Sequence, residues 1–356
     1  MSRQKKRKIG VLTFHRCVNY GSYWQARALL EGLTARGDHV ELLDHDCPSV
    51  RIAEYKCALQ PLLPRRTPRS LFGRYAAKAR RFEAAAAGLA CSPKFPLDKP
   101  EEAGAYDLIV VGSDEVWNFQ HPWYGGKRIF FGDGLTTRRL VAYAASFGNH
   151  DAEIGIDPRW SERLRRFSAI SVRDENGRRL IGAGLGREAE LVLDPCLQFP
   201  PAMPKSGEGS PYLVLYGHGF PEWFRDEVRA VAMRRGWRIV SVGYHNDWAD
   251  EQRIDLGPEQ FPAVIGGAQA VATNFFHGSV FAIAAGTPFV CVASAYRRNK
   301  LRDLTLSLGA ADHLVDARTP PERFAALLGT PLAPRVAESL AAMRERSARY
   351  LEQALA

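Results

Sequence analysis

Short apolar runs alternate with amphipathic stretches along most of the chain. The run KIGVLTFH at residues 8–15 indicates a buried strand, and HVELLDH at 39–45 indicates a second one. Between them, SYWQARALLEGLTARG at 22–37 repeats apolar positions at helical spacing and ends at a glycine, which is typical of an amphipathic helix. A strand, a helix and a strand in this order predict one βαβ unit of a parallel sheet.

The same alternation continues to residue 309 with one interruption. Before the interruption we expect four further strands, at 106–114, 138–147, 168–174 and 189–194. The segment PPAMPKSGEGSP at 200–211 is rich in Pro, Gly and Ser and is the best candidate for a linker. After it we expect strands at 212–218, 238–245, 270–274 and 288–294, and helices at 222–236, 258–268, 278–286 and 300–309.

These patterns predict an α/β protein with two domains and a cleft between them. A chain of 356 residues exceeds the usual size of one core. We place the first domain at 1–199, including a basic helical segment at 51–90, and the second domain at 200–330. Residues 331–356 hold a long amphipathic helix that is a candidate to pack back on the first domain.

The formal charge of +9 is concentrated in two segments. Residues 1–8 carry five basic side chains and no acid, and residues 51–81 carry nine basic side chains against one acid, which leaves −4 for the remainder. This segregation, with no aromatic residue interleaved in the N-terminal run, argues against a nucleic-acid partner. Both segments are most simply solvated, and contact of these basic segments with an anionic membrane surface is the alternative left open.

Composition and cysteine spacing restrict the class of protein further. With 46% hydrophobic and 24% charged residues, the chain is typical of a globular protein. No apolar run approaches the roughly 20 residues of a membrane span, and no apolar secretory segment follows the N-terminus, so we expect a cytoplasmic protein. The six cysteines are scattered without a C-x-x-C pair, and no His/Cys cluster has zinc spacing, so we expect no metal site.

His277 is the leading catalytic candidate. The run VATNFFHG ends a predicted strand near Asn274 and begins a predicted helix near Gly278. In open parallel sheets, ligands bind where strands end and helix N-termini converge. A histidine placed there can act as a general acid, although a histidine packed between strand and helix is the plainer interpretation of the local pattern.

Other polar residues gather at the predicted ends of other strands. Arg173 follows one strand and is suited to bidentate capture of a carboxylate or phosphate, unless it pairs with Asp174 or Glu175. The segment after the strand at 288–294 adds further cations at Arg297, Arg298 and Lys300. On the first domain, strand ends present a group of small, polar and aromatic residues: Arg16, Asn19, Gly21, Ser113, Asp114, Trp117 and Ser146.

Six ordered blocks resemble the polysaccharide pyruvyl transferase family. They are GVLTFHRCVNYGSYWQARAL, DLIVVGSDEVWN, VAYAASFG, SVRDENG, LVLDP and TNFFHGSVFAIAAGTPFV, and they extend over residues 9–314. The resemblance implies two Rossmann-like domains facing across a cleft, similar to the GT-B glycosyltransferase architecture. It also implies transfer of a pyruvyl group from phosphoenolpyruvate, without another cofactor, to hydroxyls of a saccharide or lipid-linked saccharide, with release of phosphate.

The resemblance also assigns roles by position. His277 matches the histidine proposed as the general acid, and Arg173 matches an arginine expected to hold the anionic donor. Lys300 corresponds more loosely to a basic residue of the family. We therefore expect Arg173, Arg298, Lys300, Asn274 and Gly278 on the donor side, and Arg16, Asn19, Gly21, Ser113, Asp114, Trp117 and Ser146 on the acceptor side.

The sequence departs from the family pattern at the histidine block. The family usually reads Asp-Ser-Phe-His-Gly, or carries Arg two residues before the histidine, whereas this chain has Asn274 and Phe275. Glu115 stands where Gln is common. Two alternatives remain open: a GT-B glycosyltransferase that uses a nucleotide sugar, and a non-catalytic sugar-binding relative. A homo-oligomer is also left open.

Overall fold

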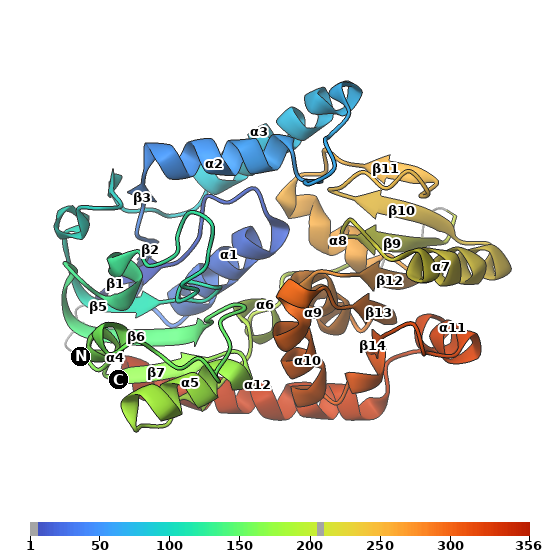
Figure 1. The fold of residues 1–356 in the computed structure, drawn as a ribbon. Helices are drawn as coiled ribbons and strands as arrows, with labels where there is room; N and C mark the ends of the chain where they lie inside the picture. Colours follow the sequence, from blue (N-terminus) through green and yellow to red (C-terminus); the bar gives the residue numbers. More distant parts are fainter. Residues whose placement is uncertain (1–5, 205–209) are drawn as a thin grey trace.

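Two six-stranded parallel sheets form the frame of the protein (Figure 1). The computed structural model describes residues 6–204 and 210–356. The first sheet has the order β2 (His39–Leu42), β1 (Lys8–Leu12), β5 (Ala105–Val111), β6 (Thr136–Ala145), β7 (Ala169–Val172) and β8 (Glu190–Leu191). The second has the order β11 (Glu251–Arg253), β10 (Arg238–Val242), β9 (Tyr212–Tyr216), β12 (Ala270–Thr273), β13 (Phe289–Val292) and β14 (Leu314–Val315).

Helices connect the strands, as parallel pairing requires. The first domain contains α1 (Tyr20–Thr34), α2 (Pro48–Leu59), α3 (Phe72–Ala87), α4 (Pro158–Leu164), α5 (Glu175–Leu185) and α6 (Pro195–Gln198). The second contains α7 (Glu222–Arg235), α8 (Phe261–Gly266), α9 (Phe276–Ala285), α10 (Arg298–Ser307) and α11 (Pro321–Gly329). A small sheet of β3 (His45–Asp46) and β4 (Phe95–Pro96) lies beside the first. The predicted α/β class with two facing Rossmann-like domains is confirmed.

The last helix, α12 (Pro334–Leu355), joins the two domains along one side (Figure 1). The Tyr350 hydroxyl donates a hydrogen bond of 2.6 Å to the backbone oxygen of Ala142 in β6. The Ser347 hydroxyl accepts from the backbone nitrogen of Leu193 at 2.9 Å. Leu351 and Leu355 are buried in the apolar cluster that covers the first sheet. The C-terminal half of this helix therefore packs on the first domain, while Val336 and Leu340 are buried in a cluster that includes α10 of the second.

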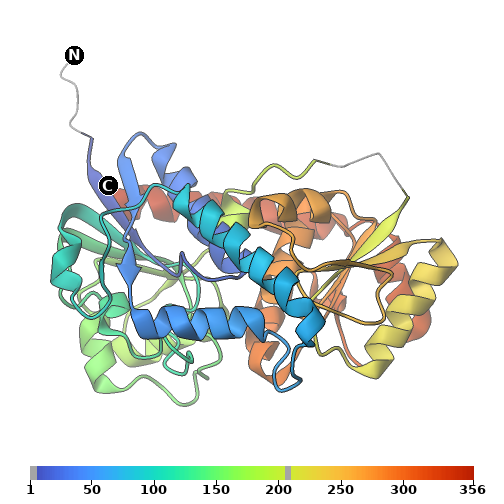
Figure 2. The same cartoon turned by 90° about the horizontal axis from the view of Figure 1, so that it is seen from above.

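Helices α2 and α3 cross the junction between the domains on the opposite side (Figure 2). Arg74 of α3 donates to the Asp255 carboxylate at 2.8 Å, and the Tyr75 hydroxyl accepts from the backbone nitrogen of His245 at 3.0 Å. Arg81 donates to the Asp255 carbonyl at 2.7 Å. Part of the basic segment thus binds the second domain, which corrects the expectation of a purely solvated face.

The predictions for the N-terminal basic run and for the linker also need comment. Arg7 and Lys8 do not belong to a solvated tail, because Arg7 pairs with Asp38 at 2.6 Å and Lys8 begins β1. Residues 1–5 of that basic run and residues 205–209 of the predicted linker lie outside the described residues. Across the ranges that the structure describes, no helix is long and apolar enough to cross a membrane.

Candidate active site

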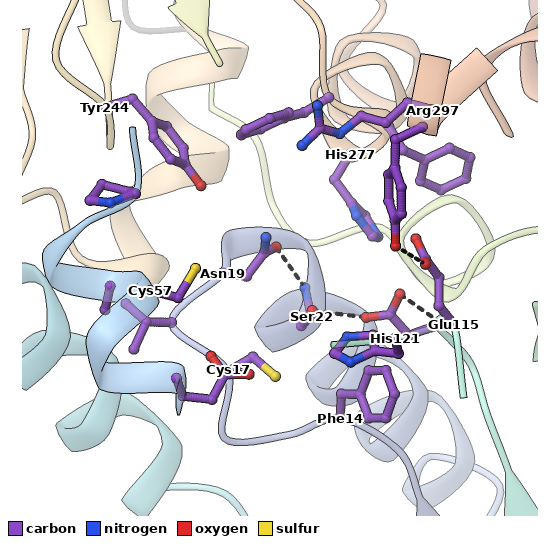
Figure 3. A pocket seen from close by; sticks show the side chains of 18 of the residues that line it. Phe14, Cys17, Asn19, Ser22, Cys57, Glu115, His121, Tyr244, His277 and Arg297 are labelled. Atoms are coloured by element: carbon purple, nitrogen blue, oxygen red, sulfur yellow. Dashed lines mark hydrogen bonds between the residues drawn. The ribbon is translucent and has the colours of Figure 1, made fainter. Parts of the chain in front are cut away.

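A cavity of about 280 Å³ lies where the two domains meet (Figure 3). The first domain contributes residues from the loop after β1, from α2 and α3, and from the loop after β5. The second contributes the end of β9, the β12–α9 turn and the segment that opens α10. Because these are the carboxyl ends of parallel strands, the location is the one expected for a ligand site in this architecture.

His277 lines this cavity at the start of α9. Its Nε2 atom lies 3.5 Å from Oδ2 of Asp194 and makes no hydrogen bond among the described residues. Burial acts to raise the pKa of Asp194, but His277 and Arg173 outweigh it and hold that pKa well below its usual value. Asp194 is therefore an anion that can stabilise a protonated imidazole.

Gly21 packs against the imidazole of His277 and not against the cavity. A Cβ atom added at Gly21 would lie 1.9 Å from Nδ1 of His277, far inside van der Waals contact. The first turn of α1, capped by Asn19, therefore packs directly against the ring and fixes its position across the domain junction. Gly21, which we expected on the acceptor side, therefore contacts His277 and does not line the cavity.

Arg173 is surrounded by carboxylates. Its Nη1 donates to Oδ2 of Asp194 at 2.9 Å, and its Nη2 donates to Oδ1 of Asp114 at 3.1 Å. Its guanidinium also lies 4.7 Å from the ring centroid of Phe276. Burial alone would lower the pKa of Arg173, but Asp114 and Asp194 raise it overall. The two carboxylates balance this cation before any ligand enters.

The partners of Arg173 differ from those expected locally. Asp174 caps α5 by accepting from the backbone nitrogen of Gly177 at 2.7 Å, and it also accepts from the Ser146 hydroxyl at 2.6 Å. Asp114 caps no helix: its backbone adopts φ +72°, and it accepts from the hydroxyl of Ser22 at 2.8 Å. Asp114 therefore links the first helix of the first domain to Arg173.

Lys300 is balanced in the same way. Its ammonium donates to Oε1 of Glu115, while Oε2 of Glu115 accepts from Asn118 at 2.8 Å and from the Tyr296 hydroxyl at 3.0 Å. Burial acts to raise the pKa of Glu115, but Lys300 lowers it below its usual value. Glu115, the departure from the family's Gln, thus neutralises the lysine that the resemblance places on the donor side. We call the group Arg173, Lys300, His277, Asp114, Glu115 and Asp194 the paired wall.

A second part of the cavity carries cations without such partners. Lys78 of α3 and Arg297 line it together with His218 and the rings of Tyr244 and Phe275. Within the described residues, neither Lys78 nor Arg297 forms an ion pair with a carboxylate. Burial lowers the pKa of Lys78 to about 7. We call these five residues the unpaired wall.

Five of the predicted site residues line the cavity: His277, Arg173, Lys300, Asn19 and Asp114. The others lie elsewhere. The Trp117 indole is fully buried and donates to the Phe130 carbonyl at 2.9 Å, so it cannot stack on an acceptor. Ser113 and Ser146 are also fully buried, and Ser113 donates to Gln25 at 2.8 Å.

The remaining predictions also need correction. Arg16 pairs with Asp44 at 2.5 Å and lines a separate, smaller cavity. Arg298 is exposed at the start of α10 and does not line the cavity between the domains. Asn274 is buried, does not line the cavity, and donates to the His218 carbonyl at 2.7 Å. A Cβ at Gly278 would lie 2.2 Å from Oγ1 of Thr273, so this glycine allows close helix–strand packing.

The described residues include one group with metal-ligating chemistry. Ligand atoms of Asp194, Cys196 and His277 lie within 4.8 Å of one another, although the sequence spacing gave no sign of it. The Arg173 guanidinium already donates to Asp194, and burial raises the pKa of the Cys196 thiol, so the group disfavours a second cation. These residues fit a hydrogen-bonded network better than a metal centre.

Comparison with known proteins agrees with this architecture. A family model described as Polysaccharide pyruvyl transferase matches residues 19–296. No curated protein matches the chain. Among solved structures, a Listeria monocytogenes protein assigned as a UDP-N-acetylglucosamine 2-epimerase is 12% identical, with a TM-score of 0.52 over 97% of this chain and 95% of that one. The glycosyltransferase SnogD from Streptomyces nogalater is 15% identical, with a TM-score of 0.40 over 98% and 100%.

Proposed function

Because the chain belongs to the polysaccharide pyruvyl transferase family, we propose that it moves the pyruvyl group of phosphoenolpyruvate onto hydroxyls of a saccharide or glycolipid acceptor. The observation that carries this proposal is His277, whose imidazole faces the cavity between the domains and is backed by Asp194 at 3.5 Å. An imidazole beside a buried carboxylate can hold and deliver a proton near neutral pH. Proton delivery to a methylene carbon is the demanding step of this transfer.

The proposed reaction follows from the positions of these groups. His277 gives a proton to the methylene carbon, which becomes a methyl group, and the neighbouring carbon, C2, becomes electrophilic. An acceptor hydroxyl adds to C2 and passes its proton to Asp114, which lines the cavity from the first domain. The bond from C2 to the phosphate oxygen then breaks, and inorganic phosphate leaves. A second hydroxyl closes the ketal at C2 and loses its proton to solvent.

Ligand-dependent melting is the first test of the donor. A ligand that binds only the folded protein raises its melting temperature by mass action. We expect phosphoenolpyruvate to raise the melting temperature more than phosphate or pyruvate does, and UDP to have no effect. A shift with UDP and none with phosphoenolpyruvate would instead support a nucleotide-sugar glycosyltransferase.

Substitution of the proposed acid is the second test. His277→Ala should reduce phosphate release from phosphoenolpyruvate by about 10²-fold to 10⁴-fold, the usual contribution of general acid catalysis. Phosphate release is measured with a panel of methyl hexosides as acceptor probes. His39→Ala is the control, because His39 is exposed on β2 and does not line the cavity. Equal activity of His277→Ala and the wild type would remove the acid role.

A further inference from the structure

Lys78 is a buried lysine whose ammonium is held by rings and one carbonyl. It donates to the backbone oxygen of Gly243 at 3.0 Å, and its Nζ lies 4.4 Å from the ring centroid of Tyr244 and 5.0 Å from that of Tyr20. Phe82 of the same helix completes the enclosure at 5.8 Å. These contacts stabilise a cation weakly and cannot replace the hydration that burial removes. The ammonium is therefore short of a negative partner.

Arg297 is in a similar position on the second domain. Its guanidinium carbon lies 4.3 Å from the ring centroid of Phe275, and its one hydrogen bond among the described residues is a long one, 3.5 Å, to the Ser294 hydroxyl. Burial lowers the pKa of Arg297 in spite of attraction from Tyr244 and Glu115. Phe275 stands two residues before His277, where the family can carry an arginine. The guanidinium of Arg297 lies over the ring of Phe275.

One set of rings lies between the two cations. The Tyr244 and Phe275 rings are 5.1 Å apart, and the His218 ring lies 5.2 Å from Tyr244 and 5.6 Å from Phe275. Burial, together with the charges of Arg297 and Lys78, lowers the pKa of His218 to about 4. Figure 3 shows Arg297 reaching toward the open centre of the cavity, with Tyr244 facing it across the opening.

The paired wall cannot supply equivalent binding. Arg173 already donates to two carboxylates, and Lys300 already donates to Glu115. An incoming dianion there would meet the negative charges of Asp114, Glu115 and Asp194 as well as the cations. At the unpaired wall the same dianion would meet cations, hydroxyls and rings. The carboxyl of Glu54 on α2 also lines the cavity, and burial raises its pKa.

We propose that Lys78 and Arg297, with His218 beside them, form a subsite for a phosphate dianion. The inference rests on the proposed function, in which the dianion is the phosphate of phosphoenolpyruvate before transfer and inorganic phosphate after it. The subsite would bind a phosphate group through charge-assisted hydrogen bonds from both cations, one supplied by each domain. It gives α3 of the first domain a part in holding the donor.

The subsite also predicts a proton linked to binding. The groups facing Lys78 are Cys57 of α2, Tyr20 of α1, and Tyr244 with His218 beyond it, and none of them is a carboxylate. At pH 8 much of the Lys78 amine is neutral, because its pKa is about 7. A bound dianion favours the charged ammonium, so binding at pH 8 should take up a fraction of a proton.

Isothermal titration calorimetry with phosphoenolpyruvate and with inorganic phosphate tests the subsite. Lys78→Met and Arg297→Gln should each weaken both ligands by about 10-fold to 100-fold, as expected for the loss of one hydrogen bond to a charged group. Lys56→Met is the matched control, because Lys56 is exposed on α2 and does not line the cavity. The uptake of protons, measured in buffers of different ionisation enthalpy at pH 8, should disappear in Lys78→Met.

The outcomes separate the subsite from the proposed function. If the wild type binds phosphoenolpyruvate and both variants bind it equally well, the subsite is overturned while the donor stands. If phosphate binds the wild type and not the variants, but phosphoenolpyruvate gives no phosphate release, the subsite stands and the proposed reaction falls. Circular dichroism of Lys78→Met and Arg297→Gln verifies that a loss of binding does not come from unfolding.

Discussion

The two walls of the cavity use buried charge in opposite ways. On the paired wall, Arg173 and Lys300 each meet carboxylates within the protein, so their charges are satisfied in the free enzyme. On the unpaired wall, Lys78 meets rings and a backbone oxygen, and Arg297 meets a ring and a hydroxyl, but neither forms an ion pair within the described residues. Burying a charge is costly unless a partner offsets it. The first wall is therefore built to hold catalytic groups in place, and the second to receive a charge from outside.

This difference changes the role expected for Arg173. A guanidinium that bridges Asp114 and Asp194 connects two loops of the first domain and fixes the carboxylate that lies beside His277. Its removal would leave two buried carboxylates without a cation. We therefore regard Arg173 as a positioning residue, whereas the resemblance assigns it to donor binding.

The largest effect is expected when the charge of Arg173 is removed from the paired wall. Arg173→Met should lower the free energy of unfolding by about 3–5 kcal/mol, the cost of leaving a buried charge uncompensated. Denaturant unfolding measures this change. Arg178→Met is the control, because Arg178 is exposed on α5 and pairs only with Glu175. If Arg173→Met were stable but had lost affinity for phosphoenolpyruvate, Arg173 would be a donor-binding residue. The proposed difference between the two walls would then be wrong.

A smaller effect is expected from moving the imidazole without removing it. Gly21→Ala places a Cβ in the space of His277 and should displace the ring, because the ideal Cβ position is only 1.9 Å from Nδ1. Misplacement of a catalytic group by about 1 Å can reduce the rate about 10²-fold. Steady-state phosphate release measures the loss, and Gly182→Ala in α5, where a Cβ meets nothing within 4 Å, is the control. Full activity of Gly21→Ala would show that the ring position is not critical.

The smallest effect, counted per pH unit, is a pH dependence of stability. The pKa of Lys78 is lowered to about 7 in the folded protein from 10.5 when exposed, so the unfolded chain binds more protons between these values. The free energy of unfolding of the wild type, relative to Lys78→Met, should therefore rise with pH by up to about 1.4 kcal/mol per unit from about pH 7 to pH 10, and stay level below pH 7. Parallel denaturant titrations at pH 6, 7.5 and 9 measure it. A flat difference would mean that Lys78 stays charged in the free protein.

The frame of the molecule could be predicted from the sequence. Each predicted strand overlaps an observed one, and the long helix predicted within 331–356 is observed as Pro334–Leu355. Period-2 and helical patterns report burial directly, so they identify such elements. Helix α2 was not separated from α3 within the predicted basic helical segment at 51–90, and its apolar face is thin: only Val50 and Ala58 of its residues are buried. Short elements such as β14 leave too few residues for a pattern.

The site could be predicted only where chemistry coincides with a strand end. His277 and Arg173 were found in this way, and both line the cavity. Trp117 follows the same rule and was placed wrongly, because a strand end does not say whether a ring faces the cavity or the core. Asp194 was contained in the block LVLDP without a role, since its partners are distant along the chain.

Lys78 was missed because its segment was interpreted as a solvated basic face. A local signal was nevertheless present: Lys78 shares the helix face of Tyr75, Ala79 and Phe82, which are apolar and buried. The ammonium of a lysine on an apolar helix face either extends to water or stays buried in a functional site. Sequence spacing could not say which, because the enclosing rings of Tyr20 and Tyr244 come from other elements.

A crystal structure with phosphoenolpyruvate bound tests directly which wall of the cavity binds the phosphate. We predict phosphate oxygens within hydrogen-bond distance of the Lys78 ammonium and the Arg297 guanidinium, with the methylene carbon facing Nε2 of His277. It also predicts that Arg173 keeps its bonds to Asp114 and Asp194. A phosphate bound by Arg173 and Lys300, with Lys78 and Arg297 left without a ligand, would contradict it.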